Sequence, residues 1–166
     1  MLFRSVSQSR YAPGLGGFFF NVRFSCPTIT SDAHFQIGLF GSTSLTAATT
    51  PSAQLNWIGC GFDATVTNLQ VFYNGAAGSA TKIDLGANFP RGTDAVFDLT
   101  LFSPPNGSFV GYRVKRIDAN YGTNGTITTN IPAASTLLAF QLKLNNNTTA
   151  SAVVSELMRV YIETDT

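Results

Sequence analysis

Alternation of apolar and polar residues recurs along almost the whole chain, and it limits the fold more than any other feature of the sequence. In the run G-F-F-F-N-V-R-F-S, residues 17–25, apolar side chains occupy every second position from Phe18, and Asn21, Arg23 and Ser25 fall between them. The same period of two recurs at 34–40, 57–63, 95–102, 108–116 and 137–145. Because successive side chains of a strand point to opposite faces, this period predicts strands with one apolar face.

Turn-forming residues separate the apolar runs. They lie at Asp32, 46–52, Asn74-Gly75, 90–92, 104–107, 120–125, 131–132 and 145–149. Asn-Gly and Pro-Asn-Gly between alternating runs are hairpin signals. Several strands at short spacing therefore predict an all-β fold, an antiparallel β-sandwich of jelly-roll type.

Two stretches need a closer reading. In N-L-Q-V-F-Y-N-G-A-A-G-S-A-T-K-I-D-L-G, residues 68–86, alternation on both sides of a small-residue loop predicts strand–turn–strand, with Asn74-Gly75 supplying the turn. Residues 150–162 have a composition compatible with a helix. Their β-branched and aromatic tail favours a final strand instead, with Met158, Val160 and Ile162 on one face.

The length of 166 residues suits one domain with a real core. We expect residues 1–16 to form an N-terminal arm or linker and residues 17–166 to form the β-sandwich. Charged residues make up 11% of the chain, against roughly 25% in ordinary soluble domains. Sparse charge promotes association, so we expect part of the surface to meet other protein. Trp57, Val96 and Phe102 point away from the predicted core and are the residues that neighbouring subunits would cover.

Composition argues against several classes of function. No apolar run approaches the roughly 18 residues of a membrane helix, so membrane insertion is not expected. The start M-L-F-R-S-V-S-Q-S-R lacks the pattern of a signal peptide, which indicates synthesis in the cytoplasm. A net charge of +1 gives no field for nucleic acid. Cys26 and Cys60 fit reduced, buried thiols.

The sequence offers little catalytic chemistry. His34 is the sole histidine, so a surface role is favoured over that of a catalytic base. Two cysteines and one histidine fall short of a zinc set, and no metal or cofactor is expected. Asp98, inside an apolar strand, is the most suggestive carboxylate, but an ion pair with Arg113 or Lys115 on the neighbouring strand is preferred. We therefore expect no enzymatic activity, with a glycan hydrolase as the least favoured alternative.

Loops rich in asparagine, tyrosine and threonine are the remaining candidates for recognition. Amides match sugar hydroxyls, and aromatic rings stack on apolar sugar faces. On this ground Asn120, Tyr121, Asn124 and Asn74 are candidate glycan-binding residues. The alternative is that they are ordinary turn residues that tolerate a left-handed backbone.

Several blocks of the sequence carry a family resemblance. They are G-G-F-F-F-N-V-R-F, N-W-I-G-C-G-F-D, T-N-L-Q-V-F-Y-N-G-A-A-G-S-A-T-K-I-D-L-G-A-N-F-P, D-A-V-F-D-L-T-L-F-S-P-P-N-G-S-F-V-G-Y-R-V and L-M-R-V-Y-I-E-T-D. Together, from about Gly16 to the end, they resemble the C-terminal β-sandwich domain of tailed-bacteriophage tail fibre and tailspike proteins. The resemblance implies a lectin-like jelly roll, usually trimeric, at the tip of a virion fibre. It implies host attachment and trimer assembly without chemistry in this domain.

Two functions follow as expectations. The first is a non-enzymatic, homotrimeric virion domain that attaches to host cell-surface carbohydrate. The second is a structural capsid or tail decoration protein that contacts only other virion proteins. The sequence fits either an excised fibre domain or a free-standing small virion protein. In the second case residues 1–14 would act as a docking arm. Arg4, Arg10, Tyr11 and Trp57 are the expected assembly contacts.

Overall fold

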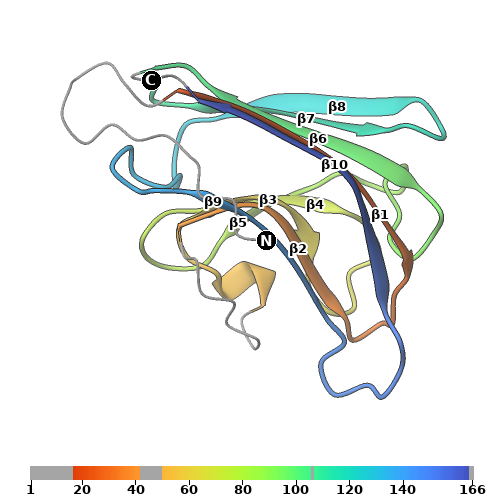
Figure 1. Ribbon diagram of the computed structural model, residues 1–166. Helices are drawn as coiled ribbons and strands as arrows, with labels where there is room; N and C mark the ends of the chain where they lie inside the picture. Colours follow the sequence, from red (N-terminus) through yellow and green to blue (C-terminus); the bar gives the residue numbers. More distant parts are fainter. Residues whose placement is uncertain (1–16, 42–49, 106, 165–166) are drawn as a thin grey trace.

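The computed structural model describes residues 17–41, 50–105 and 107–164. Its elements in chain order are β1 (Phe18–Thr28), β2 (His34–Phe40), the 3-10 helix η1 (Pro51–Ala53), β3 (Trp57–Phe62), β4 (Gln70–Asn74), β5 (Thr81–Asp84), β6 (Val96–Ser103), β7 (Val110–Arg116), β8 (Tyr121–Ile127), β9 (Ala139–Asn145) and β10 (Val154–Thr164). The strands form two five-stranded antiparallel sheets (Figure 1). Sheet A has the order β10-β1-β6-β7-β8, and sheet B has the order β5-β4-β3-β2-β9. The predicted antiparallel sandwich is confirmed.

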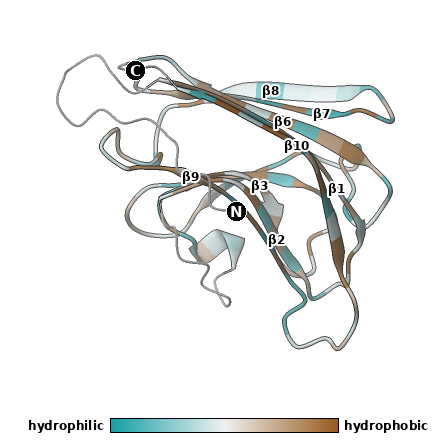
Figure 2. Cartoon of the chain, in the orientation of Figure 1, coloured by the Kyte–Doolittle hydropathy of each residue, from teal (hydrophilic) through white to brown (hydrophobic). Residues whose placement is uncertain are grey.

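The core lies between the sheets and consists of the apolar sets that the alternation predicts. Hydrophobic and hydrophilic residues alternate along β2 and β6 (Figure 2). Phe20, Phe24 and Leu99 from sheet A are fully buried, as are Phe35 and Ile58 from sheet B. The rings of Phe24 and Phe35 lie 5.5 Å apart and join the two layers. Aromatic side chains bury large areas, so these rings carry much of the core.

The hairpin of β4 and β5 forms as predicted, but its turn differs from the expected one. Asn74 is the last residue of β4, and Gly78, with φ of +80°, adopts the left-handed conformation instead of Asn74 or Gly75. The amide of Asn74 donates to the carbonyl oxygens of Gln54 at 2.7 Å and Gly78 at 3.3 Å. Asn74 therefore holds the loop through its side chain while its own backbone stays extended.

Strand β10 confirms the prediction of a final strand. It pairs with β1 along its length, with a register shift between the Arg23–Arg159 pair and the Phe24–Leu157 pair. This shift leaves Met158 outside the regular pairing, and its side chain is exposed. Val160 and Ile162 pack against the core as the alternation predicts.

Both cysteines are buried and free, as expected. Burial raises the pKa of the Cys26 and Cys60 thiols, because the thiolate is poorly solvated in the core. Within the described ranges, no helix is long and apolar enough to cross a membrane.

Candidate functional site

The outer face of sheet B is covered by its own chain. Phe40, Trp57 and Phe72 stack there in one row, with ring centroids 4.9 and 5.3 Å apart. Helix η1 lies on the same side of the sheet (Figure 1), and Ser52 is bound there through the Asp63 carboxylate and the backbone N–H of Ala80. Trp57 is 0% exposed. The expected assembly contact at Trp57 is therefore wrong, because this outward-pointing ring is buried within the chain.

The outer face of sheet A is open by contrast. The strand register sets its side chains in rows that cross all five strands, and we call two adjacent rows the polar face. The first row is Tyr161, Asn21, Thr100, Arg113 and Asn124. The second row is Arg159, Arg23, Asp98, Lys115 and Gly122.

Asp98 is the centre of the charges on the polar face. Arg23 donates to both of its carboxylate oxygens, at 2.8 and 2.6 Å, and Arg159 lies 3.6 Å from it. The expected pairing of Asp98 with Arg113 or Lys115 is wrong. Although Lys115 is its register partner on β7, the planar fork of Arg23 on β1 matches the carboxylate.

The polar face has an excess of positive charge. Its two rows hold four cationic side chains and one carboxylate. Within the described ranges, Arg113 and Lys115 form no ion pair. Two further carboxylates, Glu156 and Glu163, lie on β10 at the margin of the face. The centre of the sheet is therefore the part that would attract an anion.

A groove of about 340 Å³ follows the centre of the polar face. Its lining residues are Asn21, Arg23, Asp98, Thr100, Arg113, Lys115 and Ile117. The Asn21 amide is fixed by donating to the Leu99 carbonyl at 3.2 Å and to the Thr100 hydroxyl at 3.0 Å. Arg159 donates to Asn21 Oδ1 at 2.7 Å. These bonds give the groove an ordered set of donors and acceptors before any ligand arrives.

Exposed aromatic rings border the polar face on one side. Phe19 and Phe102 form the next row of the register, and they are 37% and 45% exposed. Tyr161 is 50% exposed and meets the Phe19 ring edge to face at 6.1 Å. Rings beside amide, hydroxyl and guanidinium groups offer both stacking and hydrogen bonds to a polar ligand.

The structure does not bring the four predicted glycan-binding residues together. Asn124 lies in the polar face, and Asn120 and Tyr121 lie at the β7–β8 turn. Tyr121 pairs with Arg116, which places it on the other face of β8 from Asn124. Asn74 is buried on sheet B. Arg4, Arg10 and Tyr11 lie outside the described residues.

Sequence reasoning missed most of the polar face. The signal for this face in the sequence is the alternation, which places Asn21, Arg23 and Ser25 on one face of their strand. It could not show that β10 lies beside β1, which adds Arg159 and Tyr161.

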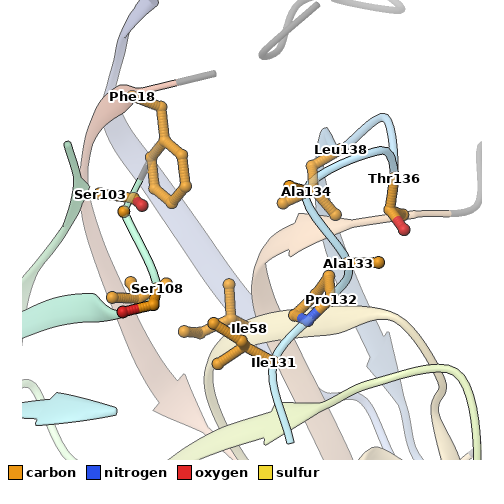
Figure 3. A pocket seen from close by; sticks show the side chains of 12 residues that line it. Phe18, Ile58, Ser103, Ser108, Ile131, Pro132, Ala133, Ala134, Thr136 and Leu138 are labelled. Carbon is orange, nitrogen blue, oxygen red and sulfur yellow. The ribbon is translucent and has the colours of Figure 1, made fainter. Parts of the chain in front are cut away.

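A second cavity, of about 280 Å³, opens at one end of the sandwich. Figure 3 shows Phe18, Ile58 and Leu138 around it, together with the segment from Ile131 to Thr136. Its lining is mainly apolar, and the Ser103 hydroxyl donates to the Phe109 carbonyl at 3.0 Å. None of the described residues that line this cavity is charged, so it differs in chemistry from the polar face.

Three polar residues lie in one row on the outer face of sheet B: Gln36 and Gln70 are buried, and Lys143 is half-buried with its Nζ out of contact with solvent. The register runs from Gln70 through Gly61 and Gln36 to Lys143. Gln36 Nε2 and Oε1, Gln70 Oε1 and Lys143 Nζ have no hydrogen-bond partner in the described part of the chain. Burial lowers the pKa of Lys143, because the ammonium is poorly solvated.

Replacing Lys143 with methionine is expected to stabilise the protein by about 1 kcal/mol, because it removes an unpaired ammonium and keeps the volume. The melting temperature should rise by roughly 2–4 °C. The lowered pKa means that the unfolded chain binds this proton over a window below pH 10.5 in which the folded chain does not. Inside this window the unfolding free energy of the native protein should therefore increase as the pH is raised. Lys143→Met should lack this increase. Equal pH profiles from urea unfolding of the two proteins would contradict this assignment.

The described residues contain no group of three or more His, Cys, Asp or Glu side chains that could hold a metal ion. The groups that the polar face of sheet A offers to a ligand are its hydrogen-bonding, ionic and stacking side chains.

Comparison with known proteins shows the fold. No family model and no curated protein sequence matches the chain. Among solved structures, the CBM2 module of the evolved Dit of Lactobacillus casei BL23 phage J-1 matches with a TM-score of 0.54 and 12% identity, over 88% of this chain and 60% of that one. Peanut lectin, solved with a 9mer peptide, matches with a TM-score of 0.57 and 10% identity, over 87% and 69%.

An alginate lyase from Pseudomonas aeruginosa also matches, with a TM-score of 0.54 and 13% identity, over 94% of this chain and 67% of that one. The part of the phage J-1 Dit chain that this protein matches is 60% of that chain's length. Similarity at this level of identity concerns the fold alone. The protein has the jelly-roll β-sandwich architecture that these carbohydrate-binding and carbohydrate-cleaving proteins share.

Proposed function

We propose that this protein is a non-enzymatic carbohydrate-binding module, and that the polar face of sheet A binds acidic polysaccharide on a host cell surface. The observation that carries the proposal is the open groove in which Arg23 and Asp98 are mutually paired while Arg113 and Lys115 are not. A bound sugar carboxylate would give these two cations a partner.

The chemistry of the face suits a sugar chain. Asn21, Thr100 and Asn124 supply amide and hydroxyl groups to pair with sugar hydroxyls. Phe19, Phe102 and Tyr161 supply exposed rings for the apolar faces of sugar rings. The sheet presents these groups at the regular spacing of its strands, as a linear polymer would need.

The phage origin of one structural neighbour and the sequence resemblance support a place in a virion. The neighbour from phage J-1 is a carbohydrate-binding module of a Dit protein, and peanut lectin is a lectin with the same fold. Our proposal is a tip domain of a tail fibre or tailspike, made in the cytoplasm of the bacterial host and assembled with other virion proteins. The homotrimer expected from the resemblance is a prediction that a mass measurement tests.

The absence of catalysis is part of the proposal. Alginate lyases share the fold, so the fold alone does not separate binding from cleavage. Asp98, the carboxylate of the groove, accepts a hydrogen bond from Arg23 on each of its two oxygens, so it is engaged in a structural ion pair. Incubation with a bound polysaccharide should release no reducing ends. Release that Asp98→Asn abolishes would overturn this part.

Replacing Arg113 with alanine is expected to weaken binding of a hexuronate oligosaccharide about tenfold or more, since a charge-assisted hydrogen bond contributes about 1.5–3 kcal/mol. Isothermal titration calorimetry with native protein and variant measures the change. Affinity should also fall as salt is raised, because the groove is open to solvent.

Two controls make this test specific. Lys82→Ala removes one cation from sheet B, where Lys82 lies 3.2 Å from Asp63, and should leave the affinity unchanged. The carboxyl-reduced oligosaccharide should bind more weakly than the acid and should lose little with Arg113→Ala. Equal losses in both variants would count against a site on sheet A.

Antibody labelling of intact particles tests the place in the virion. Label at the fibre tips is the expected result. Label spread over the capsid would favour the alternative of a decoration protein and would contradict the fibre-tip assignment.

A further inference from the structure

Strand β10 is an edge strand with a self-complementary sequence. Of the described strands, β1 alone pairs with it, so its other side presents a row of backbone N–H and C=O groups. It has eleven residues, and Leu157, Met158 and Tyr161 are each nearly half exposed. The register shift at Met158 interrupts one part of this edge, but the segment from Arg159 to Thr164 pairs regularly with β1 and can accept a partner strand on its other side.

We infer that two copies of this protein pair through β10 about a two-fold axis at Tyr161. Such an axis stands perpendicular to the sheet, so outer-face residues must lie opposite outer-face residues. With Tyr161 opposite the second copy's Tyr161, Arg159 lies opposite the second copy's Glu163, and this contact occurs twice. Placing the axis at Arg159 or at Glu163 would instead bring like charges together.

The inner face of the strand fits the same register. Val160 lies opposite the second copy's Ile162, so apolar side chains meet on the core side. In a single chain both residues pack against the core and are only partly buried. Cross-strand pairs of β-branched residues and of opposite charges each favour sheet pairing.

Strand β9 of sheet B borders the same side of the sandwich. The Phe20 ring of β1 lies 5.9 Å from the Phe140 ring of β9, so β9, the end strand of sheet B, packs across the core from the β1 and β10 end of sheet A. Phe140, Leu142 and Leu144 are also only partly buried against the core. A second copy paired at β10 would bring its own β9 toward this apolar margin, which extends the contact beyond one strand.

The pairing joins the two polar faces into one surface. The first row then runs from Asn124 to Tyr161 and continues in reverse order across the second copy. A ligand long enough to cross Tyr161 would contact both copies, and the two sites would act with a raised effective concentration. The assembly closes with two chains, in place of the three expected from the family resemblance.

Sedimentation equilibrium of the full chain over a dilution series tests the pairing. We expect twice the chain mass of 17.7 kDa, dissociating on dilution. Arg159→Glu alone and Glu163→Arg alone should each give monomers, because like charges then lie opposite one another. The double variant Arg159→Glu with Glu163→Arg should regain the dimer, since the opposite charges are restored in this register and in no other.

Circular dichroism of each variant establishes that it is folded. Arg113→Ala, on the outer face but away from β10, is the matched control and should remain dimeric. A native protein that stays monomeric at every concentration, or that forms a trimer, would overturn the inference. So would a double variant that is folded and monomeric.

Discussion

Replacing Trp57 with alanine is expected to lower the unfolding free energy by about 3–5 kcal/mol and the melting temperature by roughly 10 °C. The Trp57 ring is fully buried and stacks on Phe40 at 4.9 Å and on Phe72 at 5.3 Å. Its removal leaves a cavity between Phe40, Phe72 and Ala80, and it also removes two ring contacts, each worth about 0.5–1.5 kcal/mol beyond burial. Thermal unfolding followed by circular dichroism measures the change.

Phe102 on sheet A provides the matched control. It is also an outward-pointing aromatic residue in a strand, but it is 45% exposed. Phe102→Ala should cost less than about 1 kcal/mol, because nearly half of its surface stays in water in the folded chain and its removal leaves no enclosed cavity. If Trp57→Ala were equally mild, the stack of Phe40, Trp57 and Phe72 on sheet B would not contribute to stability.

Replacing Gly59 with alanine is expected to destabilise the protein by about 3 kcal/mol. A Cβ at this position would overlap the carbonyl oxygen of Ile37 and lie 2.9 Å from Gly38 Cα. Both atoms belong to the backbone of β2, so no side chain can move aside. Strands β2 and β3 would have to separate at the centre of sheet B.

Gly111 on β7 gives the comparison for this substitution. A Cβ there would lie at an ordinary van der Waals distance, 3.8 Å, from the Phe102 carbonyl oxygen. Gly111→Ala should change the unfolding free energy by less than about 0.5 kcal/mol. Urea unfolding of both variants measures the difference, and equal effects would contradict the close approach of β2 and β3.

The strands of this fold could be predicted from sequence because alternation reports directly on which residues share a face. The core residues of β1 and β9, and the strand character of β10, follow from that period. The turn at Asn74-Gly75 was placed correctly along the chain, but its left-handed residue is Gly78. A side-chain bond from Asn74 to the loop decides this conformation, and sequence spacing does not reveal it.

The candidate site could be predicted only in fragments, because it depends on which strands are neighbours. Asp98 pairs with Arg23, which is 75 positions away in the sequence, and Arg159 comes from the far end of the chain. The burial of Trp57 depends in the same way on Ala80, which packs in its cluster and is tied to η1 by a hydrogen bond from its N–H to the Ser52 carbonyl. Local periodicity gives the face of a residue, whereas strand order and loop packing decide its partners.

The central claim is that the polar face of sheet A binds carbohydrate. Amide chemical shifts of the isotope-labelled protein during titration with a hexuronate oligosaccharide test it most directly. We predict that the shifts change along β1, β6 and β7, at Asn21, Thr100 and Arg113 above all, and that sheet B is unaffected. Changes confined to sheet B or to the apolar cavity between Phe18 and Leu138, or no change at saturating ligand, would contradict the account.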